Sequence, residues 1–133
     1  GRIYCTEATA ELAKILLLDS GKLQEEEAEY ARKKGYSKHE KPEPLYTMED
    51  AEAVFPLFVP QKFEQSFSIH PKITVTFYHA GHILGAAIVK FRIEGDHQTK
   101  KLVFSGDLGQ RIFQQPFSWR VLGVDVRGRS RTY

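Results

Sequence analysis

Residues 72–109 constrain the fold most, because strand patterns alternate there with two glycine-rich loops. Apolar and polar side chains alternate over 72–79 and again over 87–93, which predicts two half-buried strands. The short apolar run 102–104 predicts a third strand that is covered on both faces. A turn at 94–98 would connect the second strand to the third, so we expect a meander of neighbouring strands.

The two glycine-rich loops carry one histidine and one aspartate. His82 follows the first strand, within AGHILGA at 80–86, and Asp107 follows the third strand, within SGDLG at 105–109. Strand-end loops are where a rigid sheet presents metal ligands, and glycine permits their tight backbone. On spacing alone, however, a histidine hydrogen-bonded to backbone and an aspartate that caps a turn are the commoner roles.

The first part of the chain shows helical patterns and helix caps. Thr6 can cap a helix over 10–18, which we expect Ser20 and Gly21 to stop. A second helix is predicted over 24–34, with acidic residues early and basic residues late, the order that the helix dipole favours.

A shorter helix should follow these two. Thr47 and Asp50 form a variant capping box for a helix over 48–55, which Pro56 should end. Residues 59–61 are expected to start an irregular connection. Helices first and a meander later predict the α/β class, with strands and helices in a layered sandwich.

The net charge of +2 is distributed unevenly along the chain. Residues 1–109 hold 14 basic and 16 acidic residues, whereas residues 110–133 hold five arginines, one aspartate and no lysine. We therefore expect a domain at 1–109 and a divergent Arg-rich tail at 110–133 that is foreign to the fold. The positive charge of the tail is no evidence for nucleic-acid binding, which needs a basic face on the fold itself.

The single cysteine and the hydropathy pattern bear on location. Cys5 has no partner for an internal disulfide, which fits a reducing cytoplasm. Cys5 is expected to be a buried small hydrophobe. No run of about 18 apolar residues occurs, so we expect no membrane span.

The motifs at 80–86 and 105–109 resemble the third and fourth metal motifs of the metallo-β-lactamase superfamily. The HILG string is typical of its β-CASP branch, the RNA-processing nucleases. The resemblance covers roughly residues 2–109 and implies a partial αββα sandwich. It also implies a two-zinc ribonuclease that hydrolyses RNA phosphodiester bonds, with RNA as the substrate of the parent enzyme.

The same resemblance assigns site residues. His82 would be a metal ligand, and Asp107 would be the carboxylate that bridges two zinc ions, whose mutual repulsion requires negative charge between them. His79, three residues before His82, would at most orient a metal-binding side chain without binding the metal itself. No catalytic residue is predicted beyond these.

One departure limits what this chain should do alone. The family's main ligand set, His-x-His-x-Asp-His, does not occur in the sequence. Two zinc ions need about eight ligand positions, partly shared or filled by water. We therefore expect a middle fragment of the catalytic domain that binds zinc weakly or not at all and is inactive by itself.

Two further hypotheses remain open. The parent could be a lactamase-fold hydrolase of small esters or thioesters, against which the HILG string argues. The chain could instead be a non-catalytic, truncated remnant. In that case, uncovered strand edges and an apolar face would favour a homo-oligomer.

Overall fold

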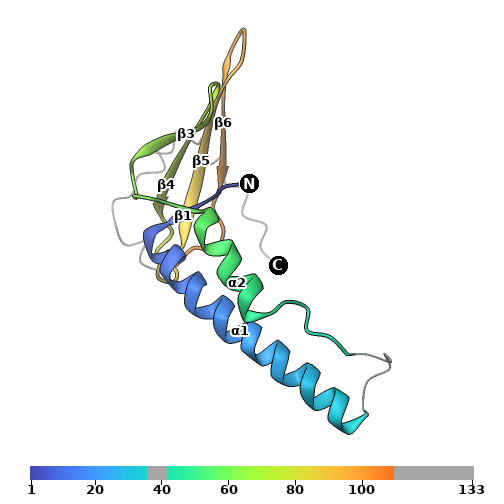
Figure 1. Ribbon diagram of the computed structural model, residues 1–133. Helices are drawn as coiled ribbons and strands as arrows, with labels where there is room; N and C mark the ends of the chain where they lie inside the picture. The colour runs from blue at the N-terminus through green and yellow to red at the C-terminus, as the bar shows by residue number, and fades with distance from the viewer. Residues whose placement is uncertain (36–41, 110–133) are drawn as a thin grey trace, which may run out of the picture. The chain divides into compact units, whose positions relative to one another are not determined.

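The computed structural model describes residues 1–35 and 42–109 (Figure 1). The chain divides into two units, Gly1–Pro60 and Gln61–Tyr133. The elements follow in the order β1 (Ile3–Thr6), α1 (Glu7–Lys34), α2 (Met48–Val54), the 3-10 helix η1 (Phe55–Leu57), β2 (Phe58–Gln61), β3 (Ser66–His70), β4 (Ile73–His79), β5 (Ala87–Glu94) and β6 (Thr99–Phe104). Helices and two sheets together make an α/β chain, as predicted. The predicted tail at 110–133 lies outside the described residues.

The first unit is built on one long helix rather than the two that were predicted. Helix α1 runs without interruption from Glu7 to Lys34. Its N-cap is Thr6, whose side-chain oxygen accepts a hydrogen bond from the backbone N–H of Thr9 at 3.2 Å. Gly35, at φ 66°, ends the helix in the left-handed conformation. The Thr6 cap agrees with the sequence prediction, but the expected stop at Ser20 and Gly21 is wrong.

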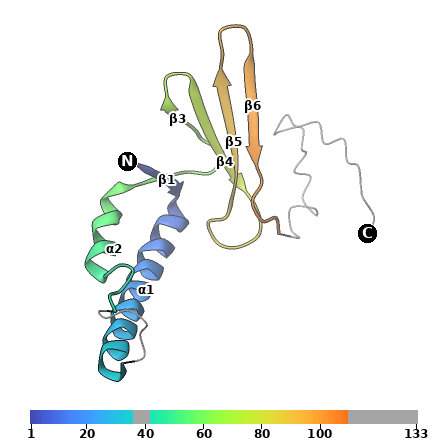
Figure 2. The same ribbon diagram turned by 90° about the vertical axis from the view of Figure 1, so that its right-hand side faces the viewer.

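The reason for this error is the packing of α1 against α2, which lie side by side in Figure 2. A Cβ added at Gly21 would lie 3.0 Å from backbone atoms of both Thr47 and Met48. Gly21 is buried within α1, where it lets the start of α2 approach the helix backbone. The glycine therefore serves a close contact between helices and does not break α1.

The start of α2 agrees with prediction, and the segment after it does not. Thr47 and Asp50 form the full capping box, with each side chain bonded to the other residue's backbone N–H. Pro56 lies in η1, just past the end of α2. The segment predicted to be irregular is strand β2, which pairs with β1. Pro60 is tolerated there because a two-stranded sheet has only edge strands.

The second unit contains a four-stranded antiparallel sheet in the order β3-β4-β5-β6 (Figure 2). Its register pairs Phe67 with Val75, and Phe77 with Val89. These side chains share one apolar face, where Phe67 and Phe77 meet edge to face at 5.2 Å between ring centroids. The residues between them in the strands, such as Thr74, Thr76 and Lys90, lie on the opposite face.

The prediction that the run 102–104 is covered on both faces is wrong. Leu102 is 48% exposed and Phe104 is 60% exposed, whereas Val75 on the inner strand β4 is 3% exposed. Strand β6 is an edge of the sheet, so only one neighbouring strand helps to shield its side chains. Self-association through this face remains a prediction. None of the helices in the described ranges is long and apolar enough to cross a membrane.

Candidate metal centre

The sheet topology brings His82 and Asp107 to the same end of the second unit. Strand β4 ends at His79, opposite the first residue of β5, and the last residue of β6 pairs with Val89 near that same end. The β4–β5 loop carries His82, and the segment after β6 carries Asp107. Two residues 25 positions apart therefore lie on adjacent loops because three consecutive strands are neighbours.

The pair fits part of a zinc site. Nε2 of His82 lies 4.0 Å from Oδ2 of Asp107. This is too long for a hydrogen bond, but it is close to the roughly 3.4 Å that separates two donors on one tetrahedral zinc ion. Imidazole nitrogen and carboxylate oxygen are both zinc ligands. The two side chains are 45% and 89% exposed, so both are open to further ligands or substrate.

Backbone hydrogen bonds hold the β4–β5 loop in shape. The N–H of Ala80 donates to the carbonyl of Ala86 at 3.1 Å, and the N–H of Ala86 donates to the carbonyl of Ile83 at 3.1 Å. Gly81 at φ 66° and Gly85 at φ 84° take left-handed conformations that the turn requires. His82 is therefore presented from a loop with a defined backbone.

Gly109 joins the two loops. Its N–H donates to the carbonyl of Ala80 at 3.0 Å. A Cβ on Gly109 would lie only 1.7 Å from the carbonyl oxygen of Gly81, so any larger residue would push the loops apart. The motif resemblance included Gly109 but gave it no role. Its contribution is to fix the separation of His82 and Asp107.

The hydrophobic contacts beneath the loops anchor them to the sheet. Ala80 is 1% exposed and Ile88 is fully buried, and together they form a core cluster. Leu108, the neighbour of Asp107 in the chain, packs against this cluster. Each candidate ligand therefore lies within two residues of a side chain that belongs to this cluster or packs against it, which limits how far either loop can move.

His79 lies at the end of β4, where its ring stacks on Phe63 with centroids 3.6 Å apart. This contact fixes the orientation of the imidazole. The expected role of His79, which is to orient a metal-binding side chain, remains a prediction.

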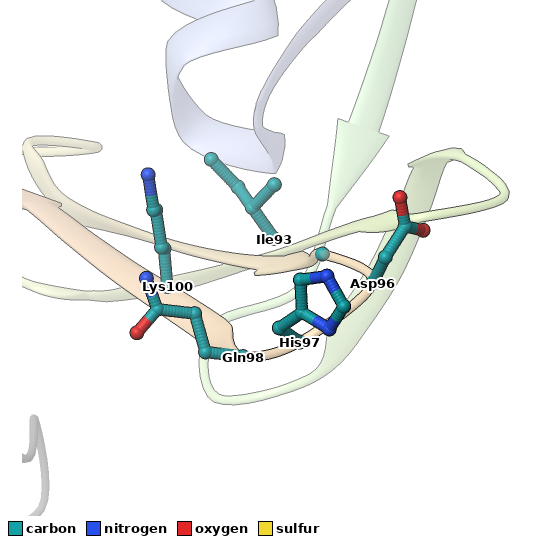
Figure 3. A pocket seen from close by; sticks show the side chains of 6 residues that line it. Ile93, Asp96, His97, Gln98 and Lys100 are labelled. Atoms are coloured by element: carbon teal, nitrogen blue, oxygen red, sulfur yellow. The ribbon is translucent and has the colours of Figure 1, made fainter.

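A second histidine–aspartate pair occurs at the turn between β5 and β6. A hollow of about 330 Å³ is lined there by side chains of the turn, including Asp96 and His97, which lie side by side in Figure 3. The carboxylate of Asp96 already binds the ammonium of Lys72 at 2.9 Å. This pair is thus a weaker metal candidate than His82 and Asp107.

The remaining candidates add no further ligand to the site. Among residues 1–35 and 42–109, no group of three or more His, Cys, Asp or Glu side chains is placed to hold a metal. Cys5 is buried, as predicted, and this burial raises the pKa of its thiol. A raised pKa keeps the thiol protonated, and metals bind the thiolate.

Sequence reasoning missed a group of cations on the polar face of the sheet. Lys90, Arg92 and Lys101 line one hollow there. The signal was available, since the alternation in β4 and β5 places Lys90 and Arg92 on the same face. The missing information was the register of β6, which brings Lys101 opposite Arg92.

Comparison with known proteins agrees with the family resemblance of the two motifs. The model of the metallo-beta-lactamase superfamily domain matches residues 1–111. The chain is 29% identical over its whole length to transcription termination factor FttA of Cenarchaeum symbiosum, and 34% identical over 80% of its length to FttA of Methanosarcina mazei. It is also 29% identical over its whole length to endoribonuclease ysh-1 of Neurospora crassa.

The chain spans 14% to 19% of the length of these curated relatives. Their names agree with the RNA-processing branch that the motifs at 80–86 and 105–109 predict. The family match covers both loops of the candidate centre and all the described strands and helices. This chain therefore belongs to the metallo-β-lactamase superfamily.

Proposed function

We propose that this chain contributes the His82 and Asp107 side of the metal centre of an RNA phosphodiester hydrolase. The observation that carries the proposal is the 4.0 Å separation of Nε2 and Oδ2 on two loops that Gly109 joins. Superfamily membership implies metal dependence, and relatives named as an endoribonuclease and a termination factor favour RNA as the substrate.

The chain's own residues would hold and orient the metal ions. His82 would donate through Nε2, and the carboxylate of Asp107 would supply negative charge between two cations, whose mutual repulsion it would reduce. When bound, zinc would supply Lewis-acid stabilisation of charge that develops on the phosphoryl oxygens. The loop backbone, fixed by the Ala80 and Gly109 hydrogen bonds, would keep both donors aimed at one place.

The remaining ligands would come from outside the present sequence. Two protein donors leave most positions of a two-zinc site unfilled. We therefore infer that the 133 residues form a middle fragment of the catalytic domain, bind zinc weakly and do not cleave RNA alone. A cytoplasmic location is expected for the same enzyme and remains a prediction.

The test uses the complete protein in which this sequence occurs. With zinc present, labelled single-stranded RNA should be cleaved, and His82→Ala and Asp107→Ala should each lower the rate by at least about a thousandfold while circular dichroism stays unchanged. His70→Ala is the matched control, since His70 is an exposed histidine of the same sheet. Full activity of His82→Ala would refute the proposal.

The two other hypotheses have their own outcomes. Turnover of thioesters or lactams by the complete protein, with RNA left intact, would establish the small-ester hydrolase. A coding sequence that starts near Gly1, with no His-x-His-x-Asp-His upstream, would establish the remnant. An in-frame His-x-His-x-Asp-His upstream supports the fragment of a nuclease.

A further inference from the structure

The polar face of the four-stranded sheet contains a hollow of about 260 Å³, separate in sequence from the candidate metal ligands. Its lining combines cations with hydroxyl groups. The cations are Lys90, Arg92 and Lys101, and the hydroxyls include those of Ser66, Thr74 and Thr76.

The strand register assembles this hollow from two rows of residues. In the first row, Ser66 pairs with Thr76, and Thr76 pairs with Lys90. In the second row, Arg92 of β5 pairs with Thr74 on one side and with Lys101 on the other. The three cations therefore come from two neighbouring strands, and the hydroxyl groups border them on the next two.

The cations repel one another in this arrangement. Arg92 and Lys101 are direct cross-strand partners, and like charges directly opposite each other destabilise a sheet. The pKa of Lys90 is lowered, first by burial and second by the charge of Lys101. Glu94 lies 3.4 Å from Arg92 and offsets part of the charge, although both side chains of that pair are more than half exposed. An anion bound in the hollow would relieve this repulsion.

The other groups in the hollow suit a phosphate. The Lys90 ammonium lies 5.8 Å from the ring centroid of Tyr78, a contact that holds the lysine over the sheet. The hydroxyls of Ser66 and Thr76 share a hydrogen bond at 2.7 Å, which leaves one of their two protons to donate. Hydroxyl groups of this kind donate to phosphate oxygens in nucleic-acid complexes. Lysine and arginine neutralise phosphate charge and supply the salt-dependent part of that binding.

We infer that the hollow formed by Lys90, Arg92, Lys101 and the bordering hydroxyls binds backbone phosphates of single-stranded RNA. This inference rests on the proposed RNA substrate and adds a docking site to it. The site reads no base, because its groups are cations and hydroxyls. It therefore contributes affinity and positioning without sequence preference.

The test measures RNA binding by the 133-residue chain in the presence of EDTA, so that no metal is involved. A fluorescein-labelled 20-nucleotide oligouridylate is titrated by anisotropy between 50 and 200 mM KCl. Replacing the three cations together (Lys90→Gln, Arg92→Gln and Lys101→Gln) should lower the magnitude of the log Kd against log salt slope by about 2, at about 0.7 per phosphate contact. Affinity at 100 mM KCl should fall roughly tenfold.

The matched control removes three exposed lysines of α1 (Lys14→Gln, Lys22→Gln and Lys33→Gln), which changes the net charge equally. This control should retain the slope and bind within about twofold of the wild type. Equal loss in both triple variants, or no loss in either, would overturn the inference. Binding of a polyglutamate of equal charge as tightly as RNA would overturn it as well.

The result is independent of the metal proposal. Since EDTA is present, a chain without any metal centre would still show the loss of RNA binding in the sheet variant. A chain without the phosphate site could still lose RNA cleavage when His82 is replaced in the complete protein. The sheet variant should remain folded, because it removes the repulsion between Arg92 and Lys101.

Discussion

Both units contain a glycine that lets two backbone segments touch, but the two glycines lie in different local structures. Gly21 sits inside a helix and faces the start of α2. Gly109 follows the candidate ligand Asp107 and faces the carbonyl of Gly81 in the loop that carries His82. In the first unit the contact brings two helices together, and in the second it joins the loops that carry the candidate ligands His82 and Asp107. The comparison shows that a glycine in a helical pattern can mark packing as well as a helix end.

The largest effect should come from Gly109→Ala. A Cβ 1.7 Å from the Gly81 oxygen cannot be accommodated without moving backbone. We expect the sheet unit to lose about 3 kcal/mol or more in free energy of unfolding, measured by urea denaturation. Gly106→Ala is the control. Gly106 has a positive φ, but the nearest atom to an added Cβ would be the Ala87 carbonyl oxygen at 4.0 Å. The variant should therefore lose only about 1–2 kcal/mol in free energy of unfolding. Equal losses in the two variants would show that the close approach is unimportant.

Gly21→Ala should have a smaller effect of the same sign. Alanine gains about 1 kcal/mol of helix propensity over glycine, but its Cβ would meet the backbone of Thr47 and Met48 at 3.0 Å. Backbone cannot move aside as a side chain can, so we expect a net loss of about 1 kcal/mol in thermal unfolding followed by circular dichroism. Ser20→Ala on the same helix should be neutral or slightly stabilising. A stabilised Gly21→Ala would mean that the helices do not pack there.

The caps could be predicted from sequence because their interactions are local. Thr47 and Asp50 lie three residues apart, so the capping box is present in the sequence itself. The role of Gly21 depends on a contact with Thr47, 26 residues further along the chain. No local sequence pattern indicates that contact. The exposure of Leu102 and Phe104 depends on which strand is the edge of the sheet, which alternation does not reveal.

The candidate site was predictable for a different reason. The strings around His82 and Asp107 resemble known metal motifs, and a meander of three strands brings them to one end of the sheet. The role of Gly109 was not predictable, because it depends on a carbonyl in the other loop. The basic hollow was missed because pairing Lys101 with Arg92 requires the exact register of β6.

The cap of α2 should give an effect no larger than that of Gly21→Ala, together with a pH dependence. Thr47→Ala should cost about 1 kcal/mol in the first unit. Hydrogen bonds from the backbone and side chain of Thr47 hold the pKa of Asp50 below its usual value. A lowered carboxyl pKa adds stability above the unfolded-state pKa, and this is lost as the pH falls through the folded-state pKa. Asp50→Asn should therefore weaken the loss of stability below about pH 4. An unchanged acid transition would contradict this.

The central claim is that His82 and Asp107 bind the same ion, and zinc titration followed by side-chain nitrogen NMR of the histidines tests it most directly. At millimolar zinc, the Nε2 resonance of His82 should shift. In Asp107→Asn the size of this shift at the same zinc concentration should be at least about fivefold smaller. Asp96→Asn is the control, since Asp96 is similarly exposed and lies beside His97 in the other turn. It should leave the His82 shift unchanged. A His82 shift that is independent of Asp107, or a zinc response confined to His97, would contradict the account.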